Sequence, residues 1–212
     1  EDVLDALLAL VDPTLSVALP AITTFDGFPA ADSARLNDWY RAAGYTPLQV
    51  HAAMSAELGR LQALPIAGAE PALLTDLPVA LALHTELFPS PYLGEEAFRR
   101  ALDATDCALF VARGAEPAAP LGYLYVEDRP TDREVYVHYL GVLESARGRG
   151  LGKALLGRAA RWGVDRGRAA MALTVREDRP AAIELYRRSG FVEASRGRQW
   201  RRTVASSMPP ST

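Results

Sequence analysis

The chain contains very little cysteine and very little lysine. Among its 212 residues, Cys107 is the one cysteine and Lys153 the one lysine. A single cysteine cannot form an intrachain disulfide, which fits a reducing compartment. The positive charge is therefore almost entirely arginine, a bias that we attribute to genomic base composition rather than to function.

Long apolar runs and basic blocks are also missing. No apolar run approaches the roughly 20 residues that a membrane-spanning helix needs, and no charged-then-apolar leader opens the chain. A formal net charge of −3 leaves no global basic surface for nucleic acid. Because 49% of the residues are apolar, we expect a globular protein. Together with the missing apolar runs and basic blocks, this predicts a cytoplasmic protein with neither nucleic-acid nor membrane partners.

The most informative segment is residues 147–152, which read Arg-Gly-Arg-Gly-Leu-Gly. It follows an apolar run at 135–142 that is typical of a strand, and it precedes apolar residues at helical spacing over 151–162. Glycine at alternate positions lets the backbone approach an anion and point successive N–H groups at it. The helix that follows adds the positive end of its dipole. The segment therefore predicts a pyrophosphate-binding loop.

From residue 70 onward the pattern predicts a mixed α/β layer. Asp76 is expected to cap the first helix, and residues 206–212 to form a flexible tail. The predicted elements are helices over 77–88 and 95–104, a hairpin of 107–112 with 121–127, a strand over 134–142, a helix over 150–165, a strand over 170–175, a helix over 180–188 and a hairpin of 191–194 with 199–204.

Two motifs in this series resemble the GCN5-related N-acetyltransferase (GNAT) superfamily. The family's phosphate loop has Arg or Gln, two residues, Gly, one residue, then Gly or Ala, which Arg147, Gly150 and Gly152 match. Its next motif has a Leu-Tyr pair followed by a Gly-aromatic pair, as residues 185–191 do here. The resemblance covers about 134–195. It implies the GNAT fold, a mostly antiparallel mixed sheet in which two parallel strands splay apart.

The resemblance implies acetyl-coenzyme A as co-substrate and no metal. The pantetheine arm would pair with the strand ending at Val142, and the N–H of Leu140 would polarise the thioester carbonyl. Arg179 stands where the family commonly has an Asn, and it could instead reach a phosphate. The implied cofactor-binding residues are Leu140, Gly141, Val142, Arg147, Gly148, Arg149, Gly150, Leu151, Gly152, Lys153 and Arg179.

The resemblance also assigns a residue to the role of general acid, whereas it leaves the general base undecided. Tyr186 stands at the family's acid position and would protonate the leaving thiolate. By the period of two, Glu134, Tyr136 and His138 share with Leu140 the strand face that we expect to line the cleft. Tyr136 occupies the position where some members carry a catalytic Glu. His138 is the first candidate base and Glu134, acting through water, the second; many members use no side-chain base.

The implied activity is direct transfer of an acetyl group to a primary amine in a ternary complex. We expect a small-molecule acceptor ahead of a protein N-terminus or lysine. A non-catalytic acyl-coenzyme A-binding sensor or interaction module is the alternative. A Rossmann-type dinucleotide protein is excluded because no acidic residue ends a second parallel strand. Candidate acceptor-binding residues are Phe88, Tyr92 and Tyr136, together with Pro89, Arg196, Arg198 and Trp200.

The first 58 residues resemble the end of the same fold. Residues 38–45 match 184–191 at an offset of 146, with acid, Tyr, Arg, Gly and aromatic retained. With a strand at 16–22 and a hairpin arm at 48–54, they predict a degenerate partial GNAT-like unit over 1–58. The complete domain would occupy 59–205, with its first strand within 57–66. No glycine-rich loop precedes Tyr40, so we expect it to be structural. The unit's open sheet edge needs cover, which the second domain, a further N-terminal portion or a partner chain, as in a homodimer, would supply.

Overall fold

The computed structural model describes residues 24–27, 30–31, 33–89, 91–114 and 119–203. The predicted strand at 16–22 and the tail at 206–212 lie outside these residues. The chain divides into two compact units, the second made of residues 52–175 and 179–194 and the first of the remainder. This division differs from a boundary at residue 58, because residues 52–58 belong to the second unit and residues from 195 onward belong to the first.

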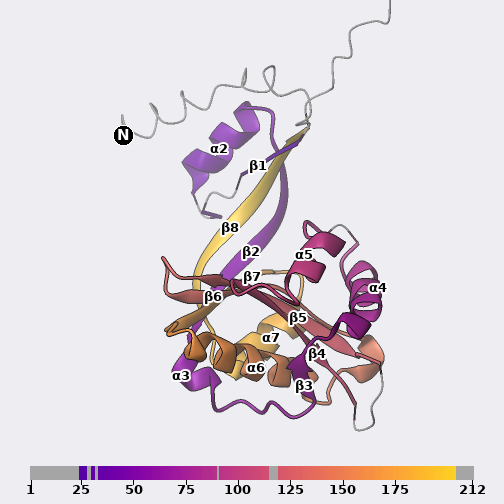
Figure 1. The fold of residues 1–212 in the computed structure, drawn as a ribbon. Helices are drawn as coiled ribbons and strands as arrows, with labels where there is room; N and C mark the ends of the chain where they lie inside the picture. Colours follow the sequence, from indigo (N-terminus) through magenta and orange to yellow (C-terminus); the bar gives the residue numbers. More distant parts are fainter. Residues whose placement is uncertain (1–23, 28–29, 32, 90, 115–118, 204–212) are drawn as a thin grey trace, which may run out of the picture. The chain divides into compact units, whose positions relative to one another are not determined.

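The second unit is built on a mixed sheet. From residue 52 onward, β2 (Thr46–Glu57) lies beside β7, and the order continues β7–β6–β5–β4–β3 (Figure 1). Neighbours from β3 to β6 are antiparallel, whereas β6 and β7 are parallel, as the predicted fold class requires. The strands are β3 (Ala69–Pro71), β4 (Cys107–Ala112), β5 (Gly122–Arg129), β6 (Glu134–Val142) and β7 (Ala170–Arg176).

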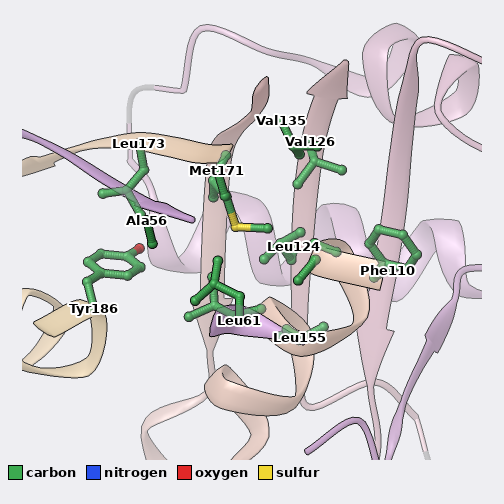
Figure 2. Packing of buried hydrophobic residues seen from close by; sticks show 14 of the residues in the cluster. Ala56, Leu61, Phe110, Leu124, Val126, Val135, Leu155, Met171, Leu173 and Tyr186 are labelled. Atoms are coloured by element: carbon green, nitrogen blue, oxygen red, sulfur yellow. The ribbon is translucent and has the colours of Figure 1, made fainter. Parts of the chain in front are cut away.

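Helices cover both faces of this sheet (Figure 1). On one face, α4 (Leu77–Leu87) and α5 (Glu95–Arg100) bury Leu83 and Phe98 against the strands. On the other, α3 (Leu58–Leu61), α6 (Leu151–Asp165) and α7 (Pro180–Ser189) form a larger core, in which Leu61 and Leu155 lie beneath the strand residues that Figure 2 labels. The first strand predicted within 57–66 is wrong, since α3 begins there and β3 starts only at Ala69.

Glycines end α6 and α7 where the sequence predicts. Gly167 follows α6 with φ +72°, and Gly190 caps α7 with φ +104°, a backbone region that residues with a Cβ rarely adopt. Asp76 is the N-cap residue of α4, as predicted, but its buried carboxylate makes no hydrogen bond to α4. The carboxylate instead accepts from the Leu73 N–H at 2.9 Å, at the start of the 3-10 turn Leu74–Asp76, and pairs with Arg113. None of the helices in the described ranges is long and apolar enough to cross a bilayer.

The first unit contains β1 (Thr24–Gly27), α2 (Ala34–Ala42), the start of β2, and β8 (Val192–Thr203) from residue 195. The predicted final hairpin is wrong because β8 is one continuous strand, whose residues from Trp200 to Thr203 pair with β1. Residues 48–54 likewise lie inside the unbroken β2. Trp200 is fully buried, stacks on Tyr40 with ring centroids 5.6 Å apart, and donates to Asn37 at 3.2 Å. Trp200 and Tyr40 are therefore core residues of this unit.

Close packing of α6 supplies a stability prediction. A Cβ on Gly157 would lie 2.5 Å from the backbone oxygen of Pro65, so an added methyl requires the chain to move. We expect Gly157→Ala to lower the free energy of unfolding by about 1–3 kcal/mol, even though alanine is the better helix former. Gly59→Ala in α3 is the matched control, because its Cβ would meet no atom within 4 Å. Urea unfolding of both variants checks this, and equal midpoints would contradict the packing argument.

Candidate functional site

Strands β6 and β7 part after four paired positions. Their parallel register runs from Glu134 opposite Ala170 to Val137 opposite Leu173. Beyond Val137, β6 continues to Val142, and over this part β5 is its only partner among the described strands. This is the splay that the family resemblance implies.

Backbone groups of β6 point into the opening. The N–H of Leu143 donates to Leu121 beside β5 at 2.9 Å, and the carbonyl of Gly141 also faces β5, since a Cβ on Gly122 would lie 2.7 Å from it. By strand alternation, the N–H and C=O groups of Leu140 and Val142 point to the open edge. An extended ligand that carries amides can add there as a further strand.

The glycine-rich loop lies directly after this edge. From Val142 the chain passes through a short 3-10 turn, Glu144–Ala146, into residues 147–150 and then α6. Gly148 and Gly150 have φ of +78° and +82°, and a Cβ on either would meet no atom within 4 Å. The space above their backbone is therefore open, and the conformation itself requires glycine.

The first turn of α6 presents backbone N–H groups that suit an anion. The first intrahelical bond is donated by Ala154 to Gly150 at 3.0 Å, so the N–H groups at 151–153 have no acceptor within the helix. They point outward together with the positive end of a 15-residue helix. These groups and the open glycine backbone form one surface for a phosphate or diphosphate.

Gly152 also serves packing. A Cβ on it would lie 3.0 Å from the Leu185 side chain of α7, so glycine lets the two helices meet closely. Its N–H is still one of the groups at the start of α6 that have no acceptor within the helix. Around the loop, Arg149 donates to the Ser145 carbonyl at 3.0 Å, and Arg147 lies exposed 4.0 Å from Glu144.

A β-bulge at His138 changes the direction of the side chains on β6. Tyr125 of β5 pairs with Tyr139 and the next residue, Val126, pairs with Val137, which leaves His138 without a partner on β5. One extra residue in a strand interrupts the alternation of faces. Val137 accordingly packs in the α6 core, whereas Tyr139 packs with α4 and α5.

The prediction that Leu140 and Val142 share a face of β6 with His138 is therefore wrong. Leu140 packs against the α6 core. His138 instead contacts the rings of Tyr125 and Tyr92, at centroid distances of 5.7 and 5.8 Å, on the α4 and α5 side. The bulge divides β6 into an N-terminal part that presents polar groups to this side and a C-terminal part that presents backbone to the opening.

His138 lies in a chain of hydrogen bonds. Its Nδ1 is 2.6 Å from the Tyr92 hydroxyl, and its Nε2 is 3.0 Å from the Glu127 carboxylate. Burial lowers the pKa of His138, an effect that Glu127 opposes. Burial alone would raise the pKa of Glu127, but hydrogen bonds from His138 and Arg129 bring it below its ordinary value. A neutral imidazole and an ionised carboxylate thus lie together at neutral pH.

These groups border a cavity of about 520 Å³ beside α5. Its lining combines aromatic and carboxylate side chains, which suits a ligand with both apolar and cationic parts. The lining includes Tyr92, Tyr125, His138, Glu95, Glu96 and Glu127.

Glu134 and Tyr136 are both tied to Arg129. The Arg129 guanidinium lies 3.7 Å from the Glu134 carboxylate and 3.7 Å above the Tyr136 ring. The Tyr136 hydroxyl donates to Thr174 of β7 at 3.0 Å, close to where the strands part. Burial raises the pKa of Glu134, partly offset by Arg129. Tyr136 therefore bridges the two strands.

Tyr186 lies on the opposite face. Its ring contacts Phe191 at 5.5 Å within the α6 core, and its hydroxyl points toward Ala56 in Figure 2. Burial raises the pKa of Tyr186, so the phenol is protonated at neutral pH. On α7, Arg179 is exposed at the N-cap, after the end of β7.

The segment after α4 is held by His84, which the sequence did not single out. Its Nε2 donates to the Leu93 carbonyl at 3.0 Å, so its Nδ1 accepts from the Tyr123 hydroxyl at 2.5 Å. The Tyr92 N–H donates to the Tyr139 hydroxyl at 2.9 Å, and Phe88 packs on the Tyr139 ring. Tyr92 is thereby positioned over β6. Within the described ranges no group of three or more His, Cys, Asp or Glu could hold a metal ion.

Comparisons with known proteins agree with this geometry. The chain is 30% identical over 82 residues to the mycothiol acetyltransferase of Jonesia denitrificans, an alignment that spans 39% of this chain and 26% of that protein. A GCN5-related N-acetyltransferase from Sphaerobacter thermophilus superposes with a TM-score of 0.65 at 23% identity, over 85% of this chain and 59% of that one. A conserved protein of unknown function from Staphylococcus epidermidis superposes with a TM-score of 0.66 at 16% identity, over 85% of this chain and 73% of that one.

A family model supplies the assignment. The model described as "Acetyltransferase (GNAT) family" matches residues 77–191, more than half of the chain. The match contains the splayed strands, the glycine-rich loop and Tyr186. The chain therefore belongs to the GNAT family of acetyltransferases.

Proposed function

We propose that this chain is an acetyl-coenzyme A-dependent N-acetyltransferase. The observation that carries the proposal is the continuity between the open edge of β6 and the glycine-rich loop. A ligand with an extended, amide-bearing arm and a diphosphate at its end satisfies both parts at once. Coenzyme A has this construction, and the GNAT family to which the chain belongs uses its acetyl thioester.

In this proposal the cofactor is held mainly by backbone. The groups of Leu140 and Val142 pair with the pantetheine amides, and the N–H groups of residues 148–153 bind the diphosphate. Gly141 lets α4 pack closely on the strand between them, since a Cβ there would lie 2.7 Å from the Leu87 side chain. The flanking Arg147, Arg149 and Lys153 add positive charge, and Arg179 at the start of α7 is placed for a further phosphate contact. One coenzyme A binds per chain.

The chemistry follows from groups on the two sides of the opening. A neutral primary amine attacks the thioester carbonyl, whose developing oxyanion accepts a hydrogen bond from the Leu140 N–H. The carbon–sulfur bond breaks, and Tyr186 donates its proton to the leaving thiolate. The reference pKa of an alkylamine is roughly 10.4, so an acceptor that arrives protonated must lose a proton to react. His138 takes it, and Glu134 is the reserve base through water.

The cavity beside α5 favours a small cationic acceptor. A volume of about 520 Å³ suits a small molecule. Its carboxylates, Glu95, Glu96 and Glu127, outnumber its single arginine, Arg100, which is paired with Asp106. Tyr92 at the rim and Phe88 behind it supply the apolar surface, with Tyr136 nearby on β6. A protein N-terminus or lysine is the second acceptor class.

Thiol release in the presence of acetyl-coenzyme A and a panel of amines and peptides tests the proposal. We expect release above the rate of hydrolysis with at least one small cationic amine, and saturation at one coenzyme A per chain in calorimetry. Binding without release on any acceptor would instead identify a non-catalytic acyl-coenzyme A sensor. Absence of binding would overturn the proposal.

A further inference from the structure

We propose that Tyr92, His138 and Glu127 form a proton path, in which Tyr92 takes the proton of the acceptor amine and Glu127 positions His138. The proposal rests on the proposed function and deepens it by reassigning Tyr92 from acceptor contact to proton carrier. It is carried by the two hydrogen bonds of His138 and by the cavity onto which all three side chains open.

The hydrogen bonds fix which ring nitrogen carries the proton. An ionised carboxylate only accepts, so the Glu127 oxygen at 3.0 Å requires a proton on His138 Nε2. Nδ1 of the neutral ring is then an acceptor, and the Tyr92 hydroxyl at 2.6 Å donates to it. The direction of the chain is therefore Tyr92 to His138 to Glu127.

Tyr92 is the member that an acceptor meets first. Its side chain is 67% exposed, whereas that of His138 is 13% exposed. With Nδ1 covered by the Tyr92 hydroxyl, an amine in the cavity reaches the phenol oxygen before the imidazole. The Tyr92 N–H bond to Tyr139 holds the backbone of this residue in place over β6.

The proton transfer balances without any further reactant. The amine N–H bond breaks and its proton moves to the Tyr92 oxygen, while the Tyr92 proton moves to His138 Nδ1. His138 becomes an imidazolium that carries a proton on each nitrogen and faces the Glu127 carboxylate. Tyr92 ends with the same number of protons with which it began, so His138 stores the proton.

The charged and titratable groups in contact with His138 or with its partners come from three segments, and Glu95, Glu96 and Arg100 of α5 and Cys107 of β4 line the same cavity. Glu127, Arg129 and Tyr125 lie on β5, Tyr136 and Glu134 on β6 itself, and Tyr92 on the segment before α5. Glu127 is the anion that faces the ring directly, and Arg129 donates to the same Glu127 oxygen at 3.1 Å. Removing the charge of Glu127 thus acts directly on His138, while Arg129 keeps the Glu134 carboxylate at 3.7 Å.

Glu127→Gln separates positioning from mere packing. Without the carboxylate the imidazolium is less favoured, so the pKa of His138 falls further. The acidic limb of kcat/KM, which rises as His138 loses its proton, is expected to shift by about 0.5–1 pH unit to lower pH. The plateau kcat should fall by about 10-fold because the base is weaker. If Glu127 had only a structural role, the acidic limb of the kcat/KM profile would keep its wild-type pH. An unshifted acidic limb would therefore overturn the positioning role of Glu127.

Tyr92→Phe tests the carrier. We expect kcat to fall by about 10–100-fold while the affinity for coenzyme A is unchanged. A variant that retains the wild-type kcat would show that the amine reaches Nδ1 directly, and that would overturn the path. Glu86→Gln, exposed on α4, and Tyr45→Phe, in the first unit, are matched controls that should behave as wild type.

A measurement without turnover keeps this inference distinct from the proposed function. Long-range proton–nitrogen NMR of the three histidines, with His138→Gln for assignment, reports tautomers in the protein alone. We expect the Nε2–H form for His138 and a lower titration midpoint in Glu127→Gln. An Nδ1–H form would overturn the inference even if acetyl transfer is found. Absence of transfer by the wild type would refute the proposed function and leave the NMR result to decide the hydrogen-bond order.

Discussion

Tyr186→Phe is expected to lower kcat for acetyl transfer by about 100-fold while the Kd for coenzyme A stays the same. General acid catalysis typically contributes about 10²–10⁴-fold, and the phenol is the group on α7 assigned to protonate the thiolate. Burial keeps the phenol protonated at neutral pH, and phenylalanine retains the ring contact with Phe191. Among the described residues no hydrogen bond to the Tyr186 hydroxyl is found, so the variant should remain as stable as wild type. Steady-state kinetics of thiol release and calorimetry check both expectations.

Tyr40→Phe is the matched control for this change. Tyr40 aligns with Tyr186 at the offset of 146, yet it packs on Trp200 in the first unit. Its loss of a hydroxyl should leave kcat unchanged. If Tyr186→Phe also kept the wild-type rate, the thiolate would leave without this acid. The assignment of Tyr186 would then be wrong although the family membership would stand.

Local signals in the sequence predict the loop and its helices well. The glycines at 148, 150, 167 and 190 have positive φ, a conformation that follows from the residue type and its place next to a helix end. Apolar spacing over α6 and α7 places both helices within about a residue of their ends. Tyr186 and the phosphate loop can thus be found from the sequence, because the features that form them lie within one short segment each.

The bulge at His138 could not be predicted in this way. It consists of one residue on β6 that β5 does not pair, and both strands read as regular alternation when each is taken alone. Its effect is nevertheless decisive, since it turns His138 away from the face of Leu140 and toward Glu127. The sequence analysis missed Glu127 for the same reason. Its partner, His138, lies 11 residues away on the neighbouring strand, and the bulge decides where that side chain points.

Long-range pairing also explains why the final hairpin was wrong and why the Asp76 carboxylate does not bond to α4. Ser195 and Gly197 are typical of a turn, but pairing with β1 and the bridge between Gly197 and Ala30 hold the strand extended. Asp76 stands at a helix start, yet Arg113, 37 residues away, engages its carboxylate. In each case a partner distant in sequence outweighs the local preference. The predicted half-copy over 1–58 stays a prediction, because its strand at 16–22 lies outside the described residues.

Gly150→Glu is expected to raise the Kd for coenzyme A by at least about 100-fold, equivalent to about 2.7 kcal/mol. The change places a carboxylate on the surface that the diphosphate would occupy, next to the N–H groups at the start of α6. Like charges repel there, and the bulk of the side chain fills the open space above the loop. Isothermal calorimetry with coenzyme A measures the effect, and acetyl transfer should fall in parallel at subsaturating acetyl-coenzyme A.

Gly167→Glu is the matched control, because it introduces the same backbone strain away from the loop. Gly167 follows the other end of α6 with φ +72° and, like Gly150, has no atom within 4 Å of an added Cβ. Both variants should lose similar stability, about 1–2 kcal/mol for a left-handed residue with a Cβ, yet Gly167→Glu should bind coenzyme A normally. Pantetheine, which lacks the diphosphate, should bind both variants and the wild type alike. If pantetheine binding also failed in Gly150→Glu, the loop would be shaping the β6 edge rather than holding a diphosphate. If coenzyme A bound Gly150→Glu as tightly as wild type, residues 148–153 would not be the diphosphate site.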